Sequence, residues 1–373
     1  MRYYIIAGEA SGDLHASNLM KSLTRKDPEA QFRCWGGDLM QAAGGDLVKH
    51  FRELAFMGFW EVAKNIRTIL RNMKFCKSDI LQWKPDVIIL VDYPGFNLRI
   101  AKWAKSHGIC VFYYISPQIW AWKEKRVHEI REHVNRMYVI LPFEKDFYKK
   151  YDYEVDFVGH PLLDVISNYR QDPDFRVKNQ LDDRPVIALL PGSRKQEINA
   201  ILSEMLKVVV DFPDHQFVVA GAPSIPPDIY EAIIGKRPVS VVFAQTYDLL
   251  SEARAALVTS GTATLETALF NVPQVVCYRG SYITYYLIRA MIKVPYISLV
   301  NLILNRSFLK ELIQGEFNRS NLRKELSFIL DKKNATLIHE SYHELKKILG
   351  ENGASEKAAD LMYKAATICR PSS

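Results

Sequence analysis

Short, uninterrupted apolar runs recur along the chain, and longer segments with helical periodicity separate them. The run Val87–Val91 contains only valine, isoleucine and leucine, which indicates a strand buried on both faces, as in a parallel sheet. Strands that alternate with helices indicate βαβ units. Because a chain of 373 residues exceeds what one hydrophobic core usually supports, we expect two α/β domains.

The two halves of the chain give separate series of predicted elements. The first series has strands at Arg2–Ala7, Phe32–Trp35, Val87–Val91, Val111–Ile115, Arg136–Ile140 and Val155–Val158. Its helices are predicted at Asp13–Thr24, Trp60–Gln82, Asn97–Ser106, Lys123–His133 and Phe143–Tyr151. The second series has strands at Val186–Leu190, Gln216–Ala220, Val239–Phe243, Ala256–Val258 and Gln274–Tyr278. Its helices are predicted at Ile198–Asp211, Tyr247–Ala253 and Ala263–Phe270, and the chain after Ser320 is predicted to be helical throughout.

The polar stretch Asn168–Arg184 separates the two series and is predicted to be a linker or a short connecting helix. We therefore expect Rossmann-like domains at residues 1–167 and 185–345, a linker at residues 168–184 and a helical tail at residues 346–373. Two doubly wound domains facing a cleft would place their functional loops at the carboxyl ends of the strands.

Composition narrows the class of protein only partly. A hydrophobic content of 48% and a charged content of 24% are typical of a globular protein. The net charge of +7 suits an anionic partner, whether a lipid surface, a nucleotide or a nucleic acid. The scattered cysteines Cys34, Cys76, Cys110, Cys277 and Cys369 are expected to be free thiols. With no long apolar segment and no signal-peptide core, we expect a cytoplasmic protein with peripheral membrane contact at most.

Three glycine-bearing loops follow predicted strands. The first, Gly8–Asp13, could bind an anion at a helix N-terminus, or could be a plain turn with Asp13 as the N-cap. It is neither a Walker A loop nor a dinucleotide-binding fingerprint. The second, Leu190–Lys195, brings Arg194 to a turn, where a guanidinium is suited to a phosphate; its alternative is a capped turn with an arginine in solvent. The third, Ser260–Glu266, could cradle a phosphate, and Glu266 could either bind ribose hydroxyls or complete a capping box.

Asp92 ends the run Val87–Val91, where a general base would project into the predicted cleft. The alternative is that Asp92 caps the turn marked by Pro94 and Gly95. The run Ser116–Trp122 places two tryptophans in a predicted loop, where they either bind a ligand or are buried under the sheet.

Taken in order, these loops resemble those of the lipid-A-disaccharide synthases, glycosyltransferases with the two-Rossmann (GT-B) fold. The resemblance extends to about Asn301. It rests on GEASGD at Gly8–Asp13, MGFWEV at Met57–Val62, DYPGFN at Asp92–Asn97, YISPQIWAW at Tyr114–Trp122, PFE at Pro142–Glu144, VGHP at Val158–Pro161, LPGSR at Leu190–Arg194, SGTATLE at Ser260–Glu266 and SLVN at Ser298–Asn301. The last motif often has proline where this chain has Val300, which bears on the course of the loop before Asn301.

The resemblance implies an inverting reaction without metal or cofactor. UDP-2,3-diacylglucosamine and 2,3-diacylglucosamine 1-phosphate would give a β-1,6-linked disaccharide 1-phosphate and UDP, with the acceptor and lipid held by the N-terminal domain and the UDP-sugar by the C-terminal domain. The implied catalytic residues are Asp92, as general base, and Glu9. Donor UDP and phosphate contacts fall on Gly192, Ser193, Arg194, Ser260, Gly261, Thr262, Glu266 and Asn301, and acceptor or lipid contacts on Ser11, Met57 and Trp60. A homodimer is also carried over as an expectation, and no nucleic-acid partner is expected.

The predicted helix Trp60–Gln82 is the candidate for contact with the inner membrane. It has an apolar stripe (Ala63, Ile66, Leu70, Met73, Ile80) and a basic stripe (Lys64, Arg67, Arg71, Lys74, Lys77). Such a helix either lies on a membrane surface or packs its apolar stripe on the sheet. The apolar segment Leu54–Trp60 before it is predicted to cover acyl chains.

Other functions also fit parts of the sequence. A UDP-sugar 2-epimerase could use the same fold and the same phosphate loops. His339–His343 matches the zinc-protease pattern H-E-x-x-H, although Ile338, Tyr342, Leu345 and Leu349 form the predicted core stripe of that helix, so we interpret the match as coincidental. A binding protein without catalysis is the remaining class.

Overall fold

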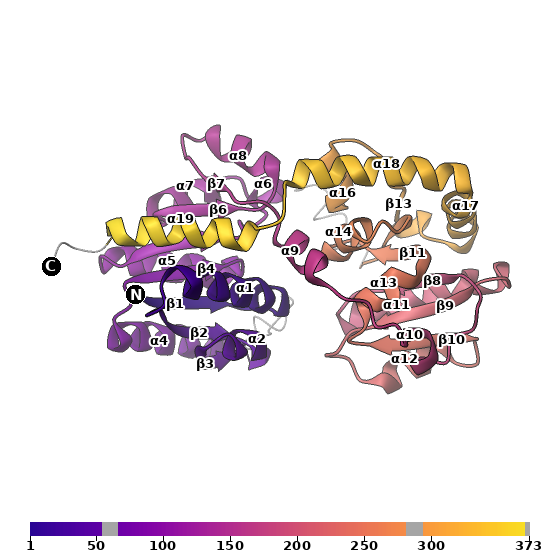
Figure 1. The fold of residues 1–373 in the computed structure, drawn as a ribbon, viewed down its shortest axis with the longest axis horizontal. Helices are drawn as coiled ribbons and strands as arrows, with labels where there is room; N and C mark the ends of the chain where they lie inside the picture. Colours follow the sequence, from indigo (N-terminus) through magenta and orange to yellow (C-terminus); the bar gives the residue numbers. More distant parts are fainter. Residues whose placement is uncertain (54–65, 281–293, 370–373) are drawn as a thin grey trace. The chain divides into compact units, whose positions relative to one another are not determined.

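The computed structural model describes residues 1–53, 66–280 and 294–369 (Figure 1). The chain divides into two compact units. The first comprises Met1–Asp164 together with Glu351–Ser373, and the second comprises Val165–Gly350. The first unit is therefore discontinuous in sequence, because the C-terminal segment returns to it.

A seven-stranded parallel sheet forms the centre of the first unit, in the order β3-β2-β1-β4-β5-β6-β7. Its strands are β1 (Arg2–Ala7), β2 (Gln31–Gly36), β3 (Gly45–His50), β4 (Val87–Val91), β5 (Cys110–Tyr114), β6 (Arg136–Val139) and β7 (Asp156–Phe157). The helices are α1 (Ala10–Lys26), α2 (Asp38–Ala42), α4 (Ile66–Trp83), α5 (Pro94–Ser106), α6 (Ile119–Trp122), α7 (Arg126–His133), α8 (Pro142–Lys149) and α19 (Ala354–Cys369), with a 3-10 turn at Phe51–Glu53. The chain passes from the first unit to the second within α9 (Pro161–Asn168). The direction of strand addition reverses between β1 and β4, which makes the sheet doubly wound.

Helices cover both faces of this sheet. α1 and α19 pack together on one face, whereas α5 packs with α4 and α7 on the other (Figure 1). Every residue of β4 and of β5 is buried in consequence. The interpretation of Val87–Val91 as a strand buried on both faces is thus confirmed.

The second unit is built around a six-stranded parallel sheet in the order β10-β9-β8-β11-β12-β13. Its strands are β8 (Val186–Leu190), β9 (Gln216–Gly221), β10 (Val239–Phe243), β11 (Ala253–Thr259), β12 (Gln274–Tyr278) and β13 (Glu311–Ile313). Its helices are α10 (Phe175–Lys178), α11 (Lys195–Met205), α12 (Pro227–Ile234), α13 (Thr246–Glu252), α14 (Thr262–Leu269), α16 (Leu299–Leu304), α17 (Arg319–Leu330) and α18 (Lys332–Leu349), with 3-10 turns at Leu206–Asp211 and Gln314–Glu316. Here the direction reverses between β8 and β11.

Two doubly wound parallel sheets confirm the predicted fold class. The strands that the sequence did not predict, β3 and β13, both lie at sheet edges. The polar stretch before Val186 contains the short helix α10, and Phe175 at its start is buried in the hydrophobic core of the second unit. Arg176 also pairs with Glu252 of α13, so this stretch is attached to the second sheet.

One expectation about the cysteines is wrong. Cys110 of β5 and Cys369 at the end of α19 form a disulfide, so the C-terminal helix is tied covalently to the first sheet. Sequence spacing gave no sign of this pair, because the two residues are 259 positions apart. Cys34, Cys76 and Cys277 are free, as expected, and the structure shows that all three are buried.

A buried ion pair joins the first sheet to α4. The carboxylate of Asp79 accepts hydrogen bonds from the Tyr4 hydroxyl at 2.7 Å and from Arg33 Nη2 at 2.6 Å. Tyr4 in turn accepts a hydrogen bond from Trp35 Nε1 at 2.8 Å. Arg33 also pairs with Asp46, but that side chain is 63% exposed whereas the Asp79 side chain is 6% exposed.

Asp79 and Asp46 both pair with Arg33, so the effect of removing a buried carboxylate can be compared with that of removing an exposed one. Asp79→Ala leaves Tyr4 and Arg33 without their buried partner, and we expect it to lower the free energy of unfolding by about 3–5 kcal/mol. Asp46→Ala removes an exposed pair and should cost about 0.2–1 kcal/mol. Urea denaturation followed by tryptophan fluorescence measures both. Equal losses would contradict the assignment of Asp79 as the buried partner.

Candidate active site

The reversal between β1 and β4 places two predicted site loops side by side. The last paired residues of these strands are Ala7 and Val91, so Gly8 and Asp92 follow directly at the same sheet edge. A Cβ added to Gly8 would lie 2.3 Å from the ring of Tyr93, which explains why glycine is needed there. Glu9 follows as the N-cap residue of α1. The sheet thus brings the Glu9 and Asp92 carboxylates together.

The proximity of these two carboxylates changes their acidity. The pKa of Asp92 is raised to about 7, first because the group is buried and then because the negative charge of Glu9 lies nearby. Burial and Glu9 also raise the pKa of the Tyr93 hydroxyl. A carboxylate that gains and loses its proton near neutral pH is suited to general base catalysis.

The remainder of the first loop has a structural role that the sequence did not reveal. Asp13 lies inside α1, so the alternative that it caps this helix is wrong. Its carboxylate accepts hydrogen bonds from the backbone amides of Gly37 at 2.7 Å, Leu39 at 3.2 Å and Met40 at 3.1 Å, and thereby caps α2. Ser11, predicted to contact the acceptor, is exposed in the first turn of α1.

Two other predicted site residues, Met57 and Trp60, lie outside the described residues, as does the apolar segment before α4. The two tryptophans after β5 lie on the short helix α6 and not in the predicted loop, and they differ in exposure. Trp120 is buried and donates from Nε1 to Glu144 at 3.2 Å, whereas Trp122 is 47% exposed with the Lys123 ammonium 4.0 Å from its ring centroid. Trp122 is therefore the one available to a ligand.

In the second unit, too, the reversal of strand order brings two predicted site loops together, but these loops carry an arginine and hydroxyl groups in place of carboxylates. β8 and β11 pair in parallel up to Leu190 and Val258, so the loops that follow them are neighbours. Gly192 has a φ of +109°, and a Cβ there would lie 2.8 Å from Glu197 and 3.4 Å from Thr259. The two predicted phosphate loops therefore lie next to each other, and the N-termini of α11 and α14 point to one edge of the sheet.

Several side chains of these loops are exposed at helix N-termini. Arg194 is 56% exposed, and its guanidinium donates to Glu197 at 2.7 Å. Ser193 and Thr262 are exposed at the N-termini of α11 and α14. Gly261, the N-cap residue of α14, has a φ of +151°. Exposed backbone amides and a cation at helix N-termini favour a bound phosphate.

Glu266 is not a capping-box residue, because Gly261 is the N-cap and Glu266 lies deeper in α14. Glu266 instead accepts a hydrogen bond from the Tyr247 hydroxyl at 3.0 Å. Burial raises its pKa, and the Tyr247 hydrogen bond partly offsets this. Ser260 donates to the carbonyl of Ile297 at 2.8 Å, which fixes the start of the loop.

Asn301, predicted to contact UDP, is fully buried with all four of its hydrogen-bonding positions in use. Its Nδ2 donates to the Leu309 carbonyl and to Glu311, both at 2.9 Å, and its Oδ1 accepts from the amides of Phe308 at 3.1 Å and Leu309 at 2.8 Å. This geometry does not support a direct contact with a nucleotide.

Val300, which stands where the family motif often has proline, lies in the first turn of α16, and Ser298 caps this helix. Proline is tolerated in the first turn of a helix, so valine and proline suit the same backbone.

The H-E-x-x-H match falls on the helix α18. His339 and His343 lie on α18, where Ile338, Tyr342 and Leu345 are buried in the predicted core stripe. Among the residues that the structure describes, no group of three or more His, Cys, Asp or Glu side chains could hold a metal ion. The interpretation of the match as coincidental therefore fits the structure.

Comparison with known proteins identifies what these loops belong to. The family model described as lipid-A-disaccharide synthetase matches residues 3–365. The chain belongs to this family. Relatives named lipid-A-disaccharide synthase in Syntrophus aciditrophicus and Myxococcus xanthus are 41% and 38% identical, over 95% and 96% of both chains. The family implied by the motifs and its glycosyltransferase activity are thus confirmed.

Solved structures show that proteins of low sequence identity share this fold. The UDP-GlcNAc 2-epimerase of Neisseria meningitidis, bound to UDP-GlcNAc, superposes with a TM-score of 0.66 at 12% identity, covering 98% of this chain and 100% of that one. The calicheamicin glycosyltransferase CalG4 superposes with a TM-score of 0.63 at 15% identity, covering 100% of both chains. Such low identity shows the fold alone, so the epimerase alternative has only a shared architecture in its favour.

The acidity of Asp92 gives a prediction for stability. Because its pKa is raised from 3.8 to about 7, the folded protein holds this proton more tightly than the unfolded chain does, and the corresponding stability is lost as pH rises through this window. We expect Asp92→Asn to unfold with a free energy on the order of 1–2 kcal/mol higher than wild type at about pH 8, with a smaller gain at about pH 5.

Thermal unfolding at both pH values measures this difference. Asp174→Asn is the matched control, because Asp174 is 69% exposed and its substitution should change little at either pH. An Asp92→Asn variant that is no more stable than wild type at high pH would contradict a buried, charged Asp92.

Proposed function

We propose that this chain joins UDP-2,3-diacylglucosamine to 2,3-diacylglucosamine 1-phosphate, with Asp92 as the general base. The observation that carries the proposal is the Asp92–Glu9 pair at the reversal of the first sheet, with the pKa of Asp92 raised to about 7. A base whose pKa lies near the working pH is the most effective one. The family membership supplies the class of reaction.

In the proposed reaction the acceptor 6-hydroxyl attacks the anomeric carbon of the donor. The new C–O bond forms as the bond between that carbon and the UDP β-phosphate oxygen breaks, and the configuration inverts. Asp92 takes the hydroxyl proton, while Glu9 keeps the pKa of Asp92 high enough for that transfer. UDP leaves with the electron pair of the broken bond.

The second unit is proposed to hold the donor and stabilise the departing UDP. Arg194 would exchange its present partner Glu197 for a phosphate oxygen, to which its planar guanidinium can donate twice. The backbone amides at Ser193, Gly261 and Thr262 add donors fixed in place before the reaction, as transition-state stabilisation requires. Glu266, beside Tyr247, is proposed to bind the ribose, whereas Asn301 is proposed to act only by shaping the loop that Ser260 contacts.

We expect Asp92→Asn to lower kcat by about 10²–10⁴-fold with the fold intact, since the variant keeps the shape of the side chain and removes its basicity. Glu9→Gln should move the acid limb of the pH profile to lower pH, because one of the causes that raise the Asp92 pKa is removed. A radiolabelled disaccharide assay at several pH values measures both.

Asp174→Asn again serves as the control and should retain the wild-type rate. Full activity of Asp92→Asn would rule out its role as the base. Wild-type protein that released no UDP from the diacylated donor and acceptor would contradict the function itself, and turnover of UDP-N-acetylglucosamine without an acceptor would instead support the epimerase.

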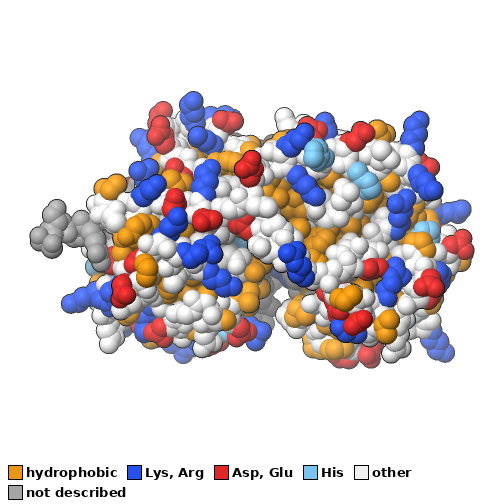
Figure 2. All heavy atoms as spheres, in the orientation of Figure 1, with side chains coloured by type: hydrophobic (Ala, Val, Ile, Leu, Met, Phe, Trp, Pro, Cys, Tyr) orange, Lys and Arg blue, Asp and Glu red, His pale blue; other side chains and the backbone are white. Residues whose placement is uncertain are grey.

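We also propose that the first unit binds a membrane surface through α4. Two residues of the predicted apolar stripe, Met73 and Ile80, are buried. Leu70 of the same stripe is 57% exposed, and Leu81 is 48% exposed. The exposed charged residues of this helix are all cations: Arg67, Arg71 and Lys74, with Lys77 partly buried beside them. Figure 2 shows cationic and acidic side chains interspersed over the face that it draws. Exposed leucines among cations suit an anionic bilayer.

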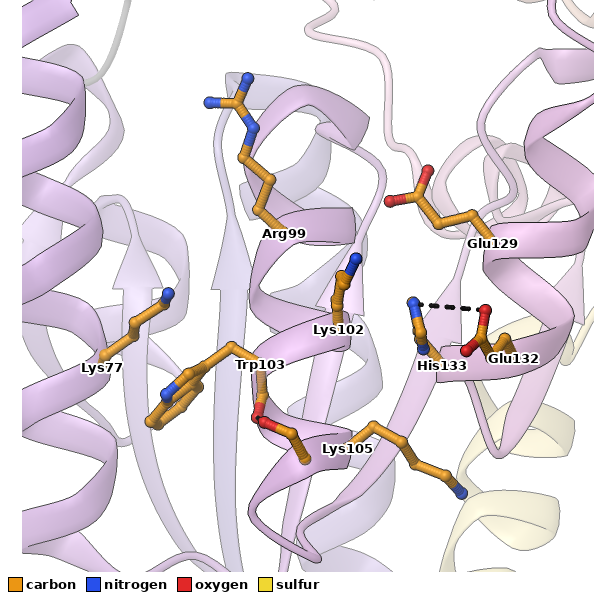
Figure 3. Close-up of a pocket in the computed structure, with 9 residues that line it drawn as sticks. Lys77, Arg99, Lys102, Trp103, Lys105, Glu129, Glu132 and His133 are labelled. Carbon is orange, nitrogen blue, oxygen red and sulfur yellow. Dashed lines mark hydrogen bonds and ion pairs between the residues drawn. The ribbon is translucent and has the colours of Figure 1, made fainter.

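A cavity of about 660 Å³ continues this surface from α4 over α5 to α7. Figure 3 shows Lys77 reaching from α4 toward Trp103 of α5, and its ammonium lies 5.6 Å from the ring centroid. Arg99, Lys102 and Lys105 add cations along α5, while Glu129 and Glu132 line the side of α7. In the described part of the chain no helix is long and apolar enough to span a bilayer.

Charge reversal tests the proposed membrane surface. We expect the double variant Arg71→Glu, Lys74→Glu to lose about tenfold or more of its binding to vesicles containing phosphatidylglycerol, because each cation near an anionic surface contributes on the order of 1 kcal/mol. Co-sedimentation measures the binding. The control Lys324→Glu, Lys347→Glu makes the same change of net charge on the second unit and should bind as wild type does. Equal losses in both variants would contradict a specific role of α4.

A further inference from the structure

The backbone at Asp92 has an unusual conformation. Asp92 has a φ of +44° and the next residue, Tyr93, has a φ of +49°. Residues with a Cβ rarely occupy this left-handed region, because the Cβ crowds the following carbonyl oxygen. Two consecutive residues in this conformation persist only where the surrounding structure holds them there, and such strain concentrates at functional sites.

Two side chains hold the peptide unit that follows Asp92. The Asp92 carbonyl oxygen accepts a hydrogen bond from Asn97 Nδ2 at 2.7 Å and another from the Tyr113 hydroxyl at 2.5 Å. Asn97 Nδ2 also lies 3.2 Å from the Val91 carbonyl oxygen. On the other side, the Asp92 amide donates to the Tyr114 carbonyl at 3.1 Å. Both ends of the residue are thereby fixed.

Neither Asn97 nor Tyr113 can touch a substrate. Asn97, in the first turn of α5, and Tyr113, on the neighbouring strand β5, are both fully buried. Any influence that they have on the reaction must therefore pass through the protein. Both side chains donate to the carbonyl oxygen of Asp92, the residue proposed as the base. Their influence on the reaction would therefore pass through the backbone of Asp92.

The orientation of this peptide unit sets the direction of the Asp92 Cα–Cβ bond, and therefore the position of the carboxylate. A shift of about 1 Å in a reacting group can cost on the order of 10²-fold in rate. We infer that Tyr113 and Asn97 are positioning residues, which hold the Asp92 carboxylate beside Glu9 for proton abstraction. The inference rests on the general-base role proposed above.

Tyr113→Phe is the sharpest variant, because it removes one hydroxyl and keeps the buried ring. Tyr138 of β6 provides a control for the loss of a buried hydroxyl: its register partner is Tyr114, so its side chain lies on the opposite face of the sheet from Tyr113. Tyr138→Phe removes a buried tyrosine hydroxyl that has no hydrogen-bond partner among the described residues, whereas Tyr113→Phe removes the hydrogen bond to the Asp92 carbonyl. Asn97→Ala removes the second donor and is an independent test.

A double-mutant cycle on kcat separates positioning from general destabilisation. We expect Tyr113→Phe and Asn97→Ala each to lower kcat by about tenfold or more, with KM for both substrates within about twofold of wild type. The acid limb of the pH profile should move to lower pH as the carboxylate leaves its buried position near Glu9. In the Asp92→Asn background, Tyr113→Phe should cause no further loss, and Tyr138→Phe should match its parent throughout.

The outcomes distinguish this inference from the function on which it rests. An inactive wild type, or an Asp92→Asn variant with full activity, would contradict the proposed function. A strongly impaired Asp92→Asn together with Tyr113→Phe and Asn97→Ala variants that match Tyr138→Phe would overturn the positioning role alone. Equal losses from Tyr113→Phe in the wild-type and Asp92→Asn backgrounds would also overturn it, because the effect would then not pass through Asp92.

Discussion

The parallel pairing of β1 with β4 is the interaction on which the candidate active site depends. Its register ends at Ala7 and Val91, so the first residues beyond the two strands leave the sheet side by side. A slip of one residue would turn the side chains of either strand to the opposite face, and burial on both faces by helices prevents it. The Glu9–Asp92 pair is thus a consequence of strand register, and its altered acidity is a consequence of the pair.

The sequence predicts the sheets well where a strand is central and apolar. β4 and β8 are continuous apolar runs, and each is present over the whole predicted range. The unpredicted strands β3 and β13 read Gly-Asp-Leu-Val-Lys-His and Glu-Leu-Ile. Such edge strands are short or partly polar, because only one neighbour pairs with them, and their pattern does not differ from that of a loop.

The site was predictable as a set of loops but not as a set of contacts. Glycines and hydroxyls after strands mark candidate ligand loops, and the loops at Gly192 and Ser260 lie next to each other. The hydrogen bonds within the site depend on which residues lie next to each other in three dimensions, and the sequence does not show this. Asn301 belongs to a family motif, yet its amide is bound by the backbone near Leu309. Tyr113 lies within a strand whose pattern indicates only core, and its hydrogen bond to Asp92 depends on which strand lies next to β4.

The return of α19 to the first unit has a consequence for biosynthesis. The second unit is one continuous segment, Val165–Gly350, whereas the first is completed only by the residues after it. On the ribosome, all the residues of the second sheet emerge before the last helix of the first sheet exists. The usual order, in which the N-terminal domain folds first, is therefore reversed for the final step: α1 waits for its packing partner α19 until the whole second unit has been synthesised.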